Sequence, residues 1–155
     1  MEYKEYGSKN NDIIILLHGG GLSWWNYIDE ISLLENEFHI VIPILDGHSG
    51  SDTNFTSIES NALEIINFIN KNYNGKVKLI GGLSLGGQIL LEILSKNPNI
   101  CECAIIESAF VMACDLLGNI RPTNHVESGR LIEKDIEKSL KTRNYKLWKL
   151  ASFIV

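Results

Sequence analysis

The sequence contains few cysteines, few prolines and no long apolar run. Its three cysteines are an odd number without a C-x-x-C pair, which excludes a disulfide framework and leaves too few ligands for a zinc site. We therefore expect reduced thiols in a cytoplasmic protein, with no metal ion and no cofactor. Every apolar run is much shorter than a membrane span, and residues 1–6 lack the positive and apolar regions of a signal peptide. These absences predict a protein that is neither secreted nor held in a membrane.

Positive charge is also scarce. The 155 residues include 14 Lys and Arg against 19 Asp and Glu, which gives a net charge of −5. A nucleic-acid-binding face needs clustered Lys and Arg to displace counterions, so this balance argues against nucleic acid as a partner. The hydrophobic fraction of 45% and the charged fraction of 21% are those of an ordinary globular protein. The length allows one domain with a substantial core.

A glycine-flanked serine stands between a strand pattern and a helix pattern. The run from Val77 to Ile80 is typical of a strand, and apolar residues recur at helical spacing from Ile89 onward. The turn between them, Gly82–Gly86, fits the G-x-S-x-G nucleophile elbow in the context that this motif requires. In such an elbow the backbone is strained and lifts the serine Oγ above the sheet. A tight turn whose serine only caps the helix is the alternative interpretation.

Strand and helix patterns alternate along the chain up to residue 107. Strands are expected at 2–7, 13–17, 39–45, 77–80 before the elbow and 101–107, and helices at 24–36, 57–72 and from the elbow to about 97. Ser23 and Ser57 can cap the first two helices, and Pro43 is the weak point of its strand. Continuous apolar strands with short connections predict an α/β, doubly wound, mostly parallel sheet covered by helices on both faces.

Two loops upstream of the elbow carry further motifs. His18 and three glycines follow the strand at 13–17, and the loop Asp46–Ser51 follows the strand at 39–45. In their order and spacing these two loops and the elbow resemble the α/β-hydrolase superfamily, and the resemblance covers about residues 1–110. It implies a hydrolase-type, mostly parallel sheet with helices on both faces and a small-molecule substrate.

The resemblance also assigns roles to particular residues. It places Ser84 as the nucleophile, the backbone N–H groups of Gly20 and Leu85 as the oxyanion hole, and Gly19, Gly21 and Trp24 as substrate contacts. Two backbone donors aimed at a developing oxyanion are each worth about 3 kcal/mol in the transition state. His18 and His48 are expected to support their loops, and Asp46 to bond to local backbone amides. An aromatic residue such as Trp24 at a helix start is also typical of a core.

The segment after residue 110 has a different character. Residues 127–141 have an amphipathic helical pattern with Leu131, Ile136 and Leu140 on one side, and an apolar stretch follows. From the resemblance we expect a hydrolase core at 1–110, with a sheet incomplete at its C-terminal end. We expect a helical lid or cap segment at 111–155 that is truncated.

The acid and the base that a serine nucleophile needs are not evident. In the family they follow the serine in the order acid, then histidine, and the only histidine after Ser84 is His125. One explanation is that the chain is the N-terminal part of a longer hydrolase. The other is a compact variant in which Glu107, at the end of its strand, is the acid and His125 is the base.

The sequence therefore predicts a serine hydrolase of esterase type for a small ester, thioester or related carbonyl substrate. Without an acid and a base, the oxyanion hole alone would give catalysis that is smaller by orders of magnitude. The alternative function is a non-catalytic binding or interaction protein that retains the elbow. An exposed sheet edge is compatible with a homodimer.

Overall fold

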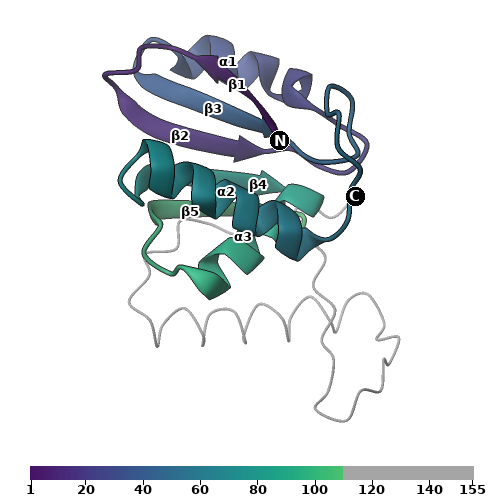
Figure 1. Ribbon diagram of the computed structural model, residues 1–155. Coiled ribbons are helices and arrows are strands. Elements are labelled where there is room, and N and C mark those ends of the chain that lie inside the picture. Colours follow the sequence, from purple (N-terminus) through teal and green to yellow (C-terminus); the bar gives the residue numbers. More distant parts are fainter. Residues whose placement is uncertain (110–155) are drawn as a thin grey trace. The chain divides into compact units, whose positions relative to one another are not determined.

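The computed structural model describes residues 1–109, which contain a five-stranded sheet in the order β1-β3-β2-β4-β5 (Figure 1). The strands are β1 (Glu2–Tyr6), β2 (Asp12–Leu17), β3 (Phe38–Ile44), β4 (Val77–Leu83) and β5 (Cys101–Glu107). β1 pairs antiparallel with β3, and the other pairs are parallel. The predicted mostly parallel α/β sheet is therefore confirmed.

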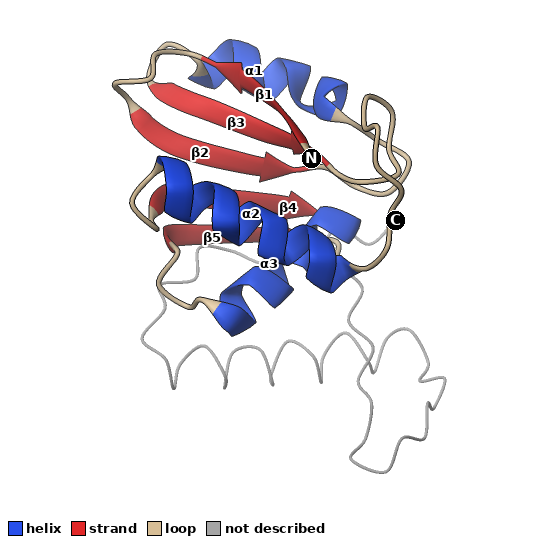
Figure 2. Cartoon of the chain, viewed as in Figure 1, coloured by secondary structure: helices blue, strands red, loops and turns tan. Residues whose placement is uncertain are grey.

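Helices cover both faces of the sheet, as the continuous apolar strands indicate. They are the 3-10 helix η1 (Trp24–Tyr27) and the α-helices α1 (Ile28–Leu34), α2 (Ile58–Asn72) and α3 (Leu85–Lys96) (Figure 2). Alternate residues of β2 supply two separate cores: Ile15 and Leu17 pack in the cluster that includes α2 and α3, whereas Ile14 and Leu16 pack with Tyr27 and Ile31. β2 is buried on both sides because each of its faces lies under a helical layer.

The first predicted helix is the element that differs most from the structure. The stretch expected as one helix at 24–36 is divided into η1 and α1. Ser23 occupies the N-cap position of η1 but makes no side-chain cap bond, so the predicted cap is wrong there. Ser57 caps α2 as predicted, because its side chain accepts a hydrogen bond from the amide of Ser60 at 3.0 Å.

Pro43 lies inside β3 without ending it. Pro43 is paired with Tyr3 of β1. The pairing of β3 with β2 ends earlier, at Val41 opposite Ile15, so Pro43 has a neighbouring strand on one side only. A proline lacks the N–H group of a sheet ladder, and it is tolerated where a strand has lost one of its neighbours.

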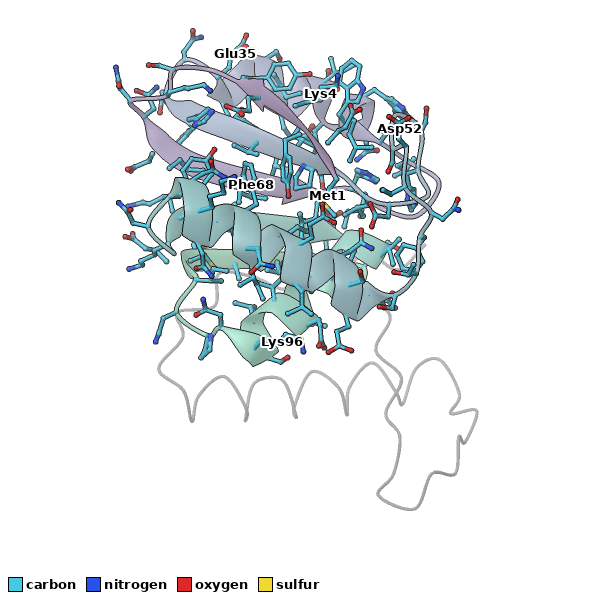
Figure 3. All side chains as sticks on the ribbon, viewed as in Figure 1. Met1, Lys4, Glu35, Asp52, Phe68 and Lys96 are labelled. Carbon is cyan, nitrogen blue, oxygen red and sulfur yellow. The ribbon has the colours of Figure 1, made fainter. Side chains whose placement is uncertain are left out.

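The N-terminal strand is tied to α2 by ring stacking. The rings of Tyr3 and Phe68 are parallel within 10°, with centroids 3.7 Å apart. Figure 3 labels Phe68 on α2 and Met1 at the start of the chain. The amino group of Met1 also forms an ion pair with Glu64 of α2. These contacts hold α2 against β1, on the face of the sheet opposite to α1.

Several predictions concern residues beyond the described part of the chain. The lid segment at 111–155, its helix at 127–141 and His125 all lie outside the described residues. Within residues 1–109, β5 is an edge strand, and the homodimer that such an edge is compatible with stays a prediction. None of the helices in that part of the chain has the length and apolar character that a membrane span requires.

Candidate active site

Ser84 connects β4 to α3 in a strained backbone conformation. Its φ of 51° and ψ of −109° are unusual for a residue with a side chain, and such a conformation costs of order 1–3 kcal/mol. Two backbone bonds hold it: the Ser84 N–H donates to the Glu107 carbonyl of β5 at 2.8 Å, and its carbonyl accepts from the Gln88 N–H at 3.0 Å. The serine side chain is exposed and makes no cap bond to the helix. The geometry therefore differs from that of a serine that only caps a helix.

Close approach of backbone segments explains the two glycines of the elbow. A Cβ on Gly82 would lie 2.4 Å from the carbonyl oxygen of Gly86, and a Cβ on Gly86 would lie 2.1 Å from the carbonyl oxygen of Leu17. Both distances are far below van der Waals contact with atoms that belong to the main chain. Only glycine at these positions lets α3 begin directly against the end of β2.

The loop of three glycines after β2 lies against the elbow. The position that a Cβ on Gly19 would occupy is 3.6 Å from the Cβ of Ser84, and that on Gly20 is 3.9 Å from the Cβ of Leu85. Gly21 has a φ of 75° and no atom near its missing Cβ. The structure thus brings the predicted nucleophile and the two predicted oxyanion-hole residues together.

His18 is a fully buried support of this loop. Its Nε2 accepts the Leu45 N–H at 3.1 Å, so its Nδ1 carries the proton and donates to the Gly19 carbonyl at 3.0 Å. Burial is the main reason that the pKa of His18 lies below its ordinary value. Because both ring nitrogens are engaged, this ring holds the backbone in place and has no free nitrogen for a substrate.

The loop after β3 is organised around Asp46 and His48. The His48 Nδ1 donates to the Asp46 carbonyl at 3.0 Å, and its ring meets that of His18 edge-on with centroids 5.1 Å apart. The Asp46 carboxylate accepts from the hydroxyl of Thr53, and not from local backbone amides as expected. The Asp46 N–H donates to the side chain of Asn61 in α2 at 3.0 Å. These groups fix the loop and leave Asp46 with a structural role.

The remaining predicted site residues have different positions. Trp24 is partly buried and packs against the core cluster of η1 and α1. This position agrees with a core residue, the alternative to a substrate contact. Glu107 is exposed at the end of β5, opposite Leu83 in register and bonded through its carbonyl to Ser84. His125 lies outside the described residues, and within residues 1–109 no group of three potential metal ligands occurs.

Two buried hydroxyl groups near the glycine loop were not predicted as site residues. The Tyr27 hydroxyl donates to the Leu17 carbonyl at 3.0 Å, and the Ser23 hydroxyl donates to the Ser49 carbonyl at 2.8 Å. The sequence offered one signal for Tyr27, because a buried tyrosine hydroxyl usually has a hydrogen-bond partner. For Ser23 the capping pattern predicted a bond to the amides of the following helix, whereas the observed partner is the Ser49 carbonyl.

Comparisons with known proteins agree with this arrangement. Residues 12–142 match the sequence model of the alpha/beta hydrolase fold. A probable alcohol acetyltransferase of Cyberlindnera fabianii is 28% identical over 132 residues, which cover 74% of this chain and 35% of that protein. The chain thus spans about a third of the length of that curated relative.

Solved structures share the fold at low sequence identity. An esterase from a marine microorganism has a TM-score of 0.67 at 21% identity, over 91% of this chain and 57% of that one. A carboxylesterase structure from Nitrososphaera gargenis has a TM-score of 0.65 at 21% identity, over 92% of this chain and 47% of that one. This chain therefore corresponds to about half of each of these structures.

Proposed function

The chain belongs to the alpha/beta hydrolase fold family, and from this premise we propose that Ser84 is the nucleophile of an acyl-transfer site. The proposed activity is hydrolysis of a small ester, thioester or related carbonyl compound. The observation that carries the proposal is the strained and exposed Ser84, whose hydroxyl caps no helix, beside Gly20 and Leu85. Strain that surrounding bonds maintain is typical of functional positions.

The chemistry follows from the elements that surround the serine. The Ser84 Oγ attacks the carbonyl carbon of the substrate while its proton passes to a base. The negative oxygen of the tetrahedral intermediate accepts hydrogen bonds from the backbone N–H groups of Gly20 and Leu85, each worth about 3 kcal/mol. The bond to the leaving group then breaks, the base protonates that group, and water releases the acid from the acyl-serine. The N-terminus of α3 adds a favourable positive dipole.

The base is proposed to come from beyond residue 109. His18 has both ring nitrogens engaged, and His39 bonds to Glu5 of β1 at 3.0 Å, near the start of its own strand. His48 is bonded to its own loop through Nδ1. His125 is the one histidine of the sequence beyond residue 109, and with Glu107 it forms the candidate pair within this chain.

Two types of relative support acyl transfer over non-catalytic binding. The solved structures named above are esterases, and the curated relative is named as an acetyltransferase. An esterase and an alcohol acyltransferase can share the acyl-serine stage and differ in whether water or an alcohol accepts the acyl group. The comparisons give no support to the non-catalytic alternative.

A fluorophosphonate probe tests the proposal. Attack by an activated serine replaces the P–F bond with an Oγ–P bond and releases fluoride, so we expect an adduct on Ser84 that peptide mass spectrometry locates. Ser84→Ala should abolish labelling, whereas Ser108→Ala, at an exposed serine after β5, should retain it. An unlabelled wild-type chain would refute the proposed activity of this 155-residue polypeptide, and labelling that survives Ser84→Ala would refute the proposed nucleophile. Labelling that survives His125→Ala would exclude the Glu107 and His125 pair.

A further inference from the structure

Hydroxyl groups from one short stretch of chain anchor both ends of the glycine loop. The loop is defined here as residues 18–22, between β2 and Ser23. Tyr27 bonds to the residue before this loop, and Ser23 is the residue directly after it. We propose that Ser23 and Tyr27 are positioning residues that hold the Gly20 amide at the proposed oxyanion hole. This inference rests on the proposed function.

Tyr27 fixes the entrance to the loop. Its hydroxyl donates at 3.0 Å to the carbonyl of Leu17, the last residue of β2, and its ring is buried in the core cluster beneath. The same carbonyl is the atom that approaches Gly86, the last glycine of the elbow. The tyrosine therefore holds a peptide group that both the glycine loop and the elbow share. Burial, with the nearby charge of Glu107, raises the pKa of Tyr27, so its hydroxyl remains a donor.

Ser23 fixes the exit from the loop. Its side chain is fully buried, and instead of capping η1 it donates at 2.8 Å to the carbonyl of Ser49 in the loop after β3. That neighbouring loop is already joined to His18 through the bond from the Leu45 N–H. The exit of the glycine loop is thus attached to the same support as its entrance.

Such anchors matter because of what the loop contains. Consecutive glycines lose more conformational freedom on ordering than any other residues, so a triglycine donor is poorly fixed by its own backbone. Within the loop, the Leu22 N–H and the His18 ring both bond to the Gly19 carbonyl, at 3.2 and 3.0 Å. An oxyanion donor is effective only when it is held in place before the reaction, and a displacement of about 1 Å can cost about 100-fold in rate.

Hydrogen exchange of the intact chain measures the positioning without requiring activity. In Tyr27→Phe and Ser23→Ala we expect two hydrogen-bonded amides that support the loop, those of Leu22 and Leu45, to exchange about fivefold faster relative to core amides of β2 and β3, the ratio that one typical hydrogen bond supplies. Tyr27→Phe keeps the buried ring and decides the question if Ser23→Ala fails to fold. Unchanged relative exchange in a folded variant would overturn the inference.

Two matched controls remove the same groups elsewhere. Tyr73→Phe removes the hydroxyl of a half-buried tyrosine after α2, and Ser95→Ala removes a hydroxyl that donates to the Glu92 carbonyl at 2.8 Å in α3. Tyr73 follows α2 and Ser95 bonds within α3, away from the glycine loop, so both controls should leave the exchange of the Leu22 and Leu45 amides at the wild-type value. Equal acceleration in the controls would also overturn the inference.

The rate of fluorophosphonate labelling separates positioning from a merely structural role. We expect Tyr27→Phe and Ser23→Ala to label at Ser84 about tenfold more slowly, and the two controls to label at the wild-type rate. Faster exchange with unchanged labelling would show that these hydroxyls order the loop without positioning the donor, and would overturn the inference. An unlabelled wild-type chain refutes the proposed function. In that case the exchange experiment still tests whether the two hydroxyl groups order the glycine loop.

Discussion

The two ends of the parallel strands use polar side chains in different ways. At the amino ends, Lys78 of β4 forms ion pairs with Glu102 of β5 at 2.9 Å and with Asp12 of β2 at 3.8 Å. All three side chains are about half exposed or more, and exposed pairs of this kind contribute little to stability. The charges at this end therefore keep the surface polar without determining the fold.

At the carboxyl ends Ser84 and Glu107 are exposed, but several polar groups around them are buried and bonded mainly to the backbone. His18, Ser23 and Asn61 are fully buried, and Asp46 is 5% exposed. A buried group that loses its partner costs about 1–3 kcal/mol, several times the worth of an exposed ion pair. The comparison teaches that sensitivity to mutation should concentrate at the end of the sheet that carries Ser84.

The largest effect is expected where a side chain would collide with backbone at the carboxyl end. Gly86→Ala places a Cβ 2.1 Å from the Leu17 carbonyl oxygen, and we expect it to lower the free energy of unfolding by about 3 kcal/mol. Gly20→Ala is the matched control for stability, because its Cβ would lie 3.9 Å from the nearest atom. Urea denaturation measures both variants. Equal midpoints for the two would contradict the close approach of α3 to β2.

A smaller effect is expected from one buried amide side chain. Asn61 accepts the Asp46 N–H at 3.0 Å and donates to the Ser57 carbonyl at 3.1 Å, so Asn61→Ala should cost about 2 kcal/mol. Asn72→Ala, in the same helix, removes an exposed bond to the Phe68 carbonyl and should cost about 0.5 kcal/mol or less. Thermal or urea unfolding compares them, and a larger loss from Asn72→Ala would break the contrast between buried and exposed groups.

The smallest effect is expected at the amino ends. Glu102→Gln should leave the urea midpoint at pH 7 unchanged within error, because the carboxylate and its lysine partners are exposed. The hydrogen bond from Lys78 is the main reason that the pKa of Glu102 lies below its ordinary value of 4.5. Any contribution of the pair is therefore present above about pH 4.5 and lost as the pH falls through the lowered pKa.

Midpoints of wild type and Glu102→Gln, measured at pH 7 and at about pH 3, test this assignment. The two proteins should not diverge as the pH falls. A difference that grows at low pH would have the wrong sign for a lowered pKa, and a large difference at pH 7 would remove the contrast between the two ends.

Local patterns were sufficient for most of the fold. The five strands, the capped helix α2 and the strand–turn–helix around Ser84 follow from apolar spacing and turn residues within a few positions of each other. The G-x-S-x-G motif identified Gly82 and Gly86 from the sequence, and the structure gives the physical reason, since a Cβ at either position would collide with backbone atoms.

What sequence reasoning missed depends on partners far along the chain. Ser23 bonds to a carbonyl 26 residues away, and the His18 ring bonds to an amide 27 residues away. A capping pattern has no information on such distant groups, so Ser23 was assigned to the nearest available amides. The first predicted helix is divided into η1 and α1 at Tyr27, whose hydroxyl bonds to the end of β2.

The bond from the Ser84 amide to the Glu107 carbonyl has a consequence for protein engineering. The elbow depends on a bond to Glu107 of β5, 23 positions further along the chain. It also depends on close packing of Gly86 against the end of β2. A Gly-Leu-Ser-Leu-Gly segment transplanted to the start of a helix in an unrelated scaffold would lack both supports. The serine would relax to an ordinary capping conformation, so the smallest transferable unit is the set of three adjacent strands together with the helix that follows Ser84.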